Sequence, residues 1–462
     1  MASESICEGD KSAIKLIEDK TIGQLFDITC RNQGLREALV FPDEQIQLTF
    51  TQLSTSVNKV AAGLCRLGLQ NGDRIILWGA NHSNHVISVF ACAKIGVIFC
   101  PLTHACNGEA LKTHLCETKA RAIICFPTIK NGHCLEMLRT LEPRIGLIES
   151  PLDSKVFPAL KFIIFDEDEC SKNCTSFADL LDSKDKLPDA ILISPEDVAA
   201  IVATSGSSDE TKLCRLSHYQ LVNSCLVGAK RLNLENMLTV LCCPLPLFRG
   251  PVLCLMLSTA VVGAKVVYPS PLPMPPTIFQ SIQDQQCTCL LSNPIALNLM
   301  LRMPAAKKFS LDSLSCVCLG GDHATLEHSI TLASRLQSLS DIAGGVFLTE
   351  AGFMPFVYPA KSKFEEIGKF DGKISDHYAA KVVNFGDTKS LPFGSPGRIC
   401  LKLIGGSKFL GYLNENFNNA CQIDDDWFLT EPCRDKSTFM QHIRIYISTF
   451  IQSEMDGSIS KS

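Results

Sequence analysis

Residues 201–224 read IVATSGSSDETKLCRLSHYQLVNS, and this stretch says most about the fold. An apolar run, which is typical of a buried strand, ends in a turn of small and hydroxyl-bearing residues. Lys212 follows the turn, and a helix is predicted to begin near His218. Backbone N–H groups in such a turn can wrap phosphate oxygens, and the lysine can supply the opposite charge. The stretch therefore predicts either a phosphate-binding loop or an ordinary polar turn between a strand and a helix.

The order of residues in this turn differs from that of a Walker A loop. A Walker A loop needs a second glycine and the order Gly-Lys-Ser/Thr, and both are missing here. The candidate phosphate ligands are instead the residues of the turn and the lysine after it. They are Thr204, Ser205, Gly206, Ser207, Ser208 and Lys212.

Outward from this turn, short apolar runs alternate with segments of helical periodicity from about residue 36 to residue 352. Residues 51–67, for example, carry apolar side chains at helical spacing and are followed by Gly68. Strand-like runs lie on both sides, at 38–41 and 74–78. Strands separated by helices predict βαβ units, and hence an α/β protein with parallel sheets covered by helices on both faces.

The pattern changes around Lys373. Strand-like runs at 377–385, 398–403 and 427–430 are separated by turns of Gly, Pro and Asn, without helical segments between them. A small antiparallel sheet or barrel is the simplest prediction for this part. The last residues, 433–462, show a short strand-like alternation and then a polar end.

Composition narrows the classes of function. Of the 462 residues, 46% are hydrophobic and 20% are charged, which is typical of a globular protein. The net charge is −5 and both signs are spread along the chain, so no nucleic-acid partner is predicted. No apolar run reaches the ~18 residues of a transmembrane segment. The acidic N-terminal residues do not resemble a transit peptide, so a cytoplasmic location is the default expectation.

Residues 203–224 resemble the TSGTTGxPKGxxLSHxxxxN signature of the adenylate-forming (AMP-binding) acyl-CoA synthetase superfamily. Further matches to this superfamily follow in order from about Thr21 to Pro432. They include PLF at 246–248, GG at 320–321, TE at 349–350, PGRIC at 396–400, GY at 411–412 and DDWFLT at 425–430. Within the superfamily, the chain is most similar to the acyl-CoA synthetase family member 2 group of medium-chain acyl-CoA ligases.

The resemblance implies an architecture. Residues 1–372 would form the AMP-binding N-terminal domain with two βα-layered subdomains, and residues 373–432 a small antiparallel β-barrel-like subdomain. Residues 433–462 would be a divergent tail in place of the family's C-terminal domain. Because the family includes mitochondrial proteins, a mitochondrial location is the alternative to the cytoplasm.

The resemblance also implies ligands. The family activates a carboxylic acid with ATP and Mg²⁺ and then transfers the acyl group to CoA. Gly320 and Gly321 match the turn that lines the adenine pocket, and Thr349 matches the residue that meets the AMP phosphate. Glu350 matches the Mg²⁺ ligand, in keeping with the preference of this ion for oxygen. Glu350 and Lys212 would be the catalytic residues, and a fatty acid or another small carboxylate would be the substrate.

Several matched positions depart from the family pattern, among them Thr211, Leu213 and Arg249 and the four that follow. The second glycine of the phosphate loop is Asp209, which adds a carboxylate beside a polyanion. The aromatic residue that stacks on adenine is Val346, and the glycine after it is Phe347. The aspartate that holds the ribose is replaced by Pro432.

Three hypotheses follow from these matches and departures. The favoured one is an acyl-CoA synthetase homologue in fatty-acid activation whose catalysis is impaired, a pseudoenzyme that binds an acyl chain or nucleotide or regulates an intact homologue. The second is an active medium-chain fatty acyl-CoA ligase. The third is a truncated product without a stable function.

Overall fold

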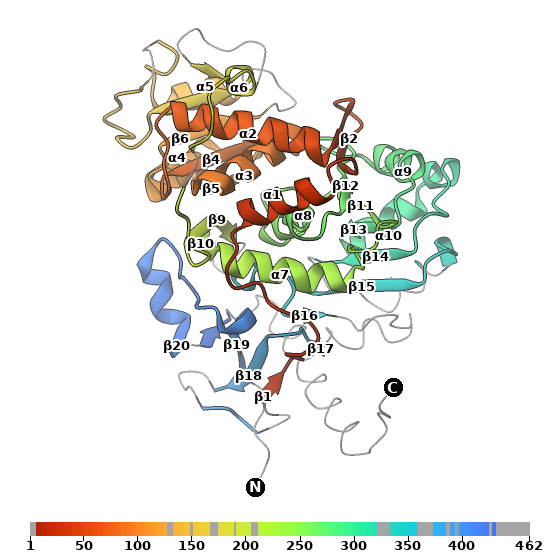
Figure 1. Ribbon diagram of the computed structural model, residues 1–462. Coiled ribbons are helices and arrows are strands. Elements are labelled where there is room, and N and C mark those ends of the chain that lie inside the picture. Colours follow the sequence, from red (N-terminus) through yellow and green to blue (C-terminus); the bar gives the residue numbers. More distant parts are fainter. Residues whose placement is uncertain are drawn as a thin grey trace.

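The computed structural model describes residues 6–126, 133–147, 151–166, 174–188, 191–204, 211–320, 332, 334–357, 373–384, 389–392, 395, 397–424 and 427–430. These residues form three sheets, and helices pack between and around the two larger ones (Figure 1). The prediction of an α/β protein with parallel strands and covering helices is confirmed.

The first sheet has seven strands in the order β10-β9-β5-β4-β6-β7-β8. All of its neighbouring pairs are parallel except β10 with β9. The central strands are buried on both faces, which explains why they read as continuous apolar runs. The strands are β4 (Arg74–Gly79), β5 (Ile98–Thr103), β6 (Ala122–Cys125), β7 (Phe162–Phe165), β8 (Thr175–Ser176), β9 (Val198–Thr204) and β10 (Lys212–Ser217).

The edge strand β10 is a feature that the sequence pattern does not predict. It runs back along β9, so that Lys212 lies opposite Thr204 across the hairpin. Leu213, Cys214 and Leu216 of this strand are buried, and packing therefore supports the hairpin in addition to the ladder hydrogen bonds.

The second sheet has nine strands in the order β17-β16-β15-β14-β13-β11-β12-β2-β3. Its central strands are parallel, and both ends finish in antiparallel pairs. The strands are β2 (Glu37–Phe41), β3 (Ile46–Thr49), β11 (Val240–Cys242), β12 (Lys265–Val267), β13 (Cys289–Ser292), β14 (Cys316–Leu319), β15 (Asp341–Val346), β16 (Phe356–Val357) and β17 (Lys373–Ile374).

Two glycines let β15 change partners halfway along its length. Gly344 pairs in parallel with Leu319 of β14, and Gly345 pairs antiparallel with Val357 of β16. Their φ angles are +143° and +149°, a region that side-chain-bearing residues rarely adopt. This change of partner sets the direction of the segment that leads to Glu350.

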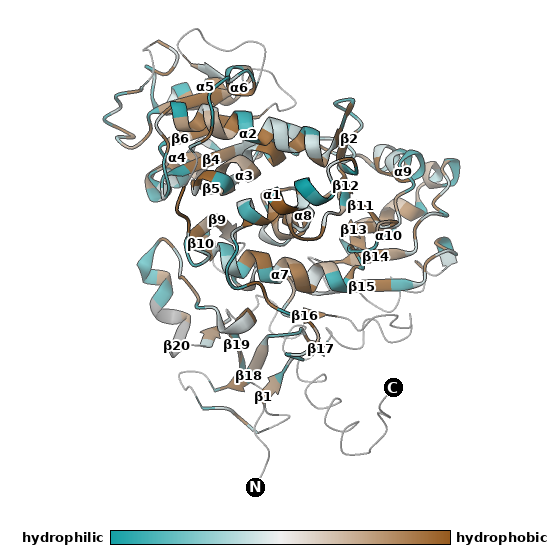
Figure 2. Ribbon diagram, viewed as in Figure 1, coloured by the Kyte–Doolittle hydropathy of each residue, from teal (hydrophilic) through white to brown (hydrophobic). Residues whose placement is uncertain are grey.

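Helices fill the space around the two large sheets. At the centre, α1 (Ile22–Asn32), α3 (Ser83–Ile95), α7 (His218–Arg231) and α8 (Gly250–Val262) pack against one another. In Figure 2, α8 is apolar and lies inside, while polar residues mark α2 (Phe50–Arg66). The outer helices are α4 (Gly108–Thr118), α5 (His133–Leu141), α6 (Phe177–Leu181), α9 (Pro275–Asp284) and α10 (Pro294–Arg302).

The third sheet is antiparallel, with the order β1-β18-β19-β21-β20. Among the described residues it is an open sheet with β1 and β20 at its edges, so the expectation of a barrel-like closure is corrected. The N-terminal strand joins it from far away in the sequence, which no local pattern indicates. The strands are β1 (Ile6–Glu8), β18 (Ala379–Val383), β19 (Arg398–Lys402), β20 (Gln422–Asp424) and β21 (Trp427–Leu429). The boundary between residues 372 and 373 stays a prediction.

In the described part of the chain, no helix has the length and apolar character needed to cross a membrane.

The change of partner along β15 can be tested with Gly345→Ala. A β-carbon at this position would overlap the carbonyl oxygen of Phe356, and the positive φ would strain any residue other than glycine. We expect a loss of about 1–3 kcal/mol in the free energy of unfolding, measured by urea denaturation. Gly108→Ala is the matched control, since a β-carbon there meets only a leucine methyl at 4.0 Å. Equal stability of the two variants would contradict the account.

Candidate functional site

Glu350 is a buried carboxylate at the meeting point of several elements. It lies on a single 3-10 turn, Thr349–Ala351, which follows β15. The hydroxyl of Tyr412 donates to Oε1 of Glu350 at 2.7 Å, and the hydroxyl of Thr204 also hydrogen-bonds this carboxyl group. Gln220 of α7 donates to the backbone oxygen of Glu350 at 2.6 Å. The carboxylate is thereby tied to β9, to α7 and to the segment that contains Tyr412.

Burial dominates the electrostatics of this carboxylate. Desolvation raises the pKa of Glu350 above its usual 4.5, and the hydrogen bonds from Tyr412 and Thr204 oppose that shift. Burial likewise raises the pKa of Tyr412, and the neighbouring Glu350 raises it further. The tyrosine therefore acts as a hydrogen-bond donor to the carboxylate.

Lys212 lies beside the same group. Its side chain is buried, and its Nζ lies 5.5 Å from the ring centroid of Tyr412 and 4.9 Å from that of Phe417. These distances fall within the ~6 Å range of cation–π attraction. Because Lys212 pairs with Thr204 across the β9–β10 hairpin, the predicted cation, hydroxyl and carboxylate meet in one region.

Gly320 follows β14 and is covered by an aromatic ring. A β-carbon added at Gly320 would overlap the ring of Phe347, so a larger residue fits there only if that ring moves. The ring centroid of Phe347 also lies 5.3 Å from that of Phe353. Phe347 thus occupies the space directly against the glycine that the sequence assigns to an adenine-binding turn.

The segment Pro246-Leu247-Phe248 is held by a residue that sequence analysis does not single out. Asn81 is buried, and its side chain accepts from the N–H of Leu247 at 2.8 Å and donates to the carbonyl of Leu245 at 3.0 Å. Asn81 is therefore the residue that fixes this segment against the loop after β4.

Thr349 packs against Gly250, where a β-carbon would come within 2.7 Å of the threonine methyl.

The structure brings together part of the predicted site. Thr204, Lys212 and Glu350 gather around Tyr412, and Thr349 precedes Glu350 on the same turn. Gly320 lies against Phe347, three residues before Glu350. The remaining predicted residues lie outside the described part of the chain: Ser205, Gly206, Ser207, Ser208, Gly321, Asp209 and Pro432. Tyr412 was predicted only as half of a Gly-Tyr match, and that match is the signal that marks it.

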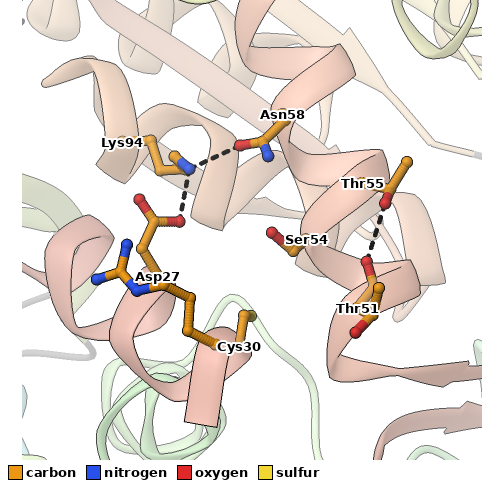
Figure 3. Close-up of a pocket in the computed structure, with 8 residues that line it drawn as sticks. Asp27, Cys30, Thr51, Ser54, Thr55, Asn58 and Lys94 are labelled. Atoms are coloured by element: carbon orange, nitrogen blue, oxygen red, sulfur yellow. Dashed lines mark hydrogen bonds and ion pairs between the residues drawn. The ribbon is translucent and has the colours of Figure 1, made fainter. Parts of the chain in front are cut away.

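A cavity of about 360 Å³ lies away from these residues, between α1, α2 and α3 (Figure 3). Lys94 crosses it and donates to Asp27 and to Asn58, both at 2.6 Å. The amine of Lys94 is therefore already engaged within the protein. Of the predicted site residues that the structure describes, none lines this cavity, which is bordered by Asp27, Cys30, Arg31, Thr51, Ser54, Thr55, Asn58 and Lys94.

The fold and a match to a known protein family together define the class of this protein. The AMP-binding enzyme family matches residues 26–413, and the chain belongs to this family. The match spans both large sheets and ends just after Tyr412.

Individual relatives narrow the comparison. The acyl-CoA ligase sidI of Aspergillus fumigatus is 29% identical over 446 residues, covering 94% of this chain and 73% of the relative. The human mitochondrial medium-chain acyl-CoA ligase ACSF2 is 25% identical over 440 residues, covering 90% and 69%.

Solved structures show the same adenylate-forming fold. The N-terminal domain of FACL13 from Mycobacterium tuberculosis superposes with a TM-score of 0.75 at 16% identity, covering 89% of this chain and 96% of that one. The anthranilate CoA ligase AuaEII, solved with anthranoyl-AMP, superposes with a TM-score of 0.77 at 20% identity, covering 91% and 76%.

The raised pKa of Glu350 leads to a prediction about pH. A carboxyl whose pKa rises on folding holds its proton more tightly in the folded state, so its ionisation lowers stability as pH rises. We expect the stability of the wild type, relative to Glu350→Gln, to fall as pH rises from about 4.5. Denaturation at a series of pH values measures this difference. Glu109→Gln, at an exposed glutamate, is the control, and a flat difference for Glu350→Gln would refute the prediction.

The contact between Gly320 and Phe347 can be measured by a double-mutant cycle. Gly320→Ala should cost about 1–3 kcal/mol, because the added methyl group overpacks the ring. The same change in a Phe347→Ala background should cost much less, since the ring is gone. Urea denaturation of the four proteins gives the coupling energy. Equal costs in both backgrounds would mean that the two residues do not touch.

Proposed function

We propose that this chain is an acyl-CoA synthetase homologue that binds a fatty acid or a related carboxylate and whose adenylation activity is impaired. Family membership and the two acyl-CoA ligase relatives support the acyl-CoA ligase part of the proposal. The observation that carries the impairment part of the proposal is the packing of Phe347 over Gly320.

The argument from Phe347 is steric. By family resemblance, Gly320 and Gly321 would line the adenine pocket, and the position of Phe347 would be a glycine. The ring of Phe347 lies in contact with Gly320, so an adenine base would have to displace it. Val346, at the position of the stacking aromatic residue, offers no π face to replace the lost contact. The residues present therefore do not fit an adenine ring as they stand.

The phosphate side supports the same proposal. Glu350 and Lys212, proposed as the metal ligand and the phosphate-binding cation, are both buried and already engaged with protein groups. The carboxylate oxygens suit Mg²⁺ chemically, but reaching them requires Tyr412 or Thr204 to give up its hydrogen bond. Each rearrangement lowers the affinity for a nucleotide–metal complex.

The active medium-chain ligase is the alternative, and the ligase names of the relatives favour it. Location and partners are also part of the proposal. By analogy with the human relative, the protein would be located in mitochondria, which a localisation experiment tests. It would also regulate an intact homologue, which co-purification tests.

The proposal predicts a gain of function. Phe347→Gly combined with Val346→Tyr should raise the affinity for ATP by about tenfold, because the change vacates the space over Gly320 and adds a stacking face. Isothermal titration calorimetry measures it, and circular dichroism checks that the variant is folded. Phe309→Gly, which removes a partly buried ring of another hydrophobic cluster, is the control and should leave the affinity unchanged.

Carboxylate-dependent ATP–pyrophosphate exchange separates the two functions. The wild type should show no exchange above background with medium-chain fatty acids. Exchange at a rate comparable with an intact acyl-CoA ligase would reject impairment and favour the active enzyme.

A further inference from the structure

The helix α10 carries an apolar stripe on its outer face. Ile295 and Leu299 are one helical turn apart, and Met303 follows at the same spacing just beyond the helix end, so the three continue along one side. Their side chains are 47%, 60% and 41% exposed. α10 is labelled toward the right-hand side of Figure 1. Three large apolar side chains in one row are therefore presented to solvent.

The helix that carries this stripe is firmly held. The side chain of Asn293 caps its start by accepting from the N–H groups of Ile295 and Ala296. Its inner face, with Leu297, Met300 and Leu301, packs into a core cluster with strands β13 and β14. The inner face therefore packs into the core, and the outer stripe is left exposed.

The chain segment that carries the stripe has charged residues of one sign. Between Asp284 and Asp312 the chain carries three cations, Arg302, Lys307 and Lys308, and no carboxylate. All three cations are exposed. The two flanking aspartates accept hydrogen bonds from their own neighbours, Asp284 from Gln280 and Gln283, and Asp312 from Ser310. An apolar row bordered by cations is complementary to an anionic lipid bilayer, because the apolar side chains can insert and the cations are attracted to the lipid phosphates.

We propose that α10 and the residues after it dock this protein on anionic membrane surfaces. Ile295, Leu299 and Met303 would enter the boundary between the lipid head groups and acyl chains. Lys307 and Lys308 would contact lipid phosphates. Such a surface would hold the protein where hydrophobic carboxylates are concentrated. The proposal is independent of catalysis, because it requires neither nucleotide binding nor acyl transfer.

Vesicle co-sedimentation of the full chain tests the proposal. The protein should bind vesicles of phosphatidylcholine mixed with phosphatidylglycerol, bind weakly to phosphatidylcholine alone, and dissociate as salt is raised. Replacing Lys307 and Lys308 by alanine should lower the partition coefficient about 25-fold, at about fivefold per cation. Leu299→Ser should lower it about tenfold.

Matched controls separate the stripe from general surface chemistry. Leu192→Ser removes a more exposed leucine on the seven-stranded-sheet side, and Lys59→Ala with Lys112→Ala removes two exposed lysines on other helices. These variants should bind vesicles like the wild type. Absence of vesicle binding at low salt, or equal losses in the controls, would overturn the proposal. Concentration-dependent self-association that Leu299→Ser abolishes, without vesicle binding, would also overturn it and assign the stripe to a second copy of this chain.

No nucleotide or fatty acid is present in this assay. Failure of membrane binding therefore leaves the proposed acyl-CoA synthetase function untouched, and failure of nucleotide binding leaves the membrane proposal untouched.

Discussion

The hydrogen bond from Tyr412 to the buried carboxylate of Glu350 is the interaction on which the site depends. It links the turn after β15 to a segment more than sixty residues later, beside the β9–β10 hairpin. A buried carboxylate without partners would carry a large desolvation cost, and the donors around Glu350 offset it. The carboxylate of Glu350 therefore has hydrogen-bond partners within the protein, and a ligand must compete with them for it.

The same constraint connects the fold to the proposed function. Gly344 and Gly345 turn β15 from one sheet partner to another, and this directs the chain through Val346 and Phe347 into Glu350. A bulky residue in that short segment has little freedom, because the strand before it and the turn after it are both fixed. Phe347 consequently lies over Gly320, and Lys212 lies beside the rings of Tyr412 and Phe417.

The docking surface proposed on α10 draws on a different part of the molecule and on different physics. The site around Glu350 is governed by burial, where every polar group needs a partner. The stripe on α10 is governed by exposure, where apolar side chains and nearby cations remain in contact with water. An acyl-chain-binding protein that docks on a lipid surface would combine the two without requiring catalysis.

The sequence alone determined the α/β class, the alternation of strands and helices and the family, because periodic burial and the signature around 201–224 are local properties of the chain. It also identified Thr204, Lys212, Gly320, Thr349 and Glu350 as candidates, through their matches to family positions. It did not identify β10 as a strand, nor the pairing of β1 with β18, nor the role of Asn81. Only the tertiary structure decided these, because each depends on partners far away in the chain. It alone showed that Phe347 lies against Gly320 and that Tyr412 satisfies Glu350, since packing and desolvation depend on which distant groups the fold brings together.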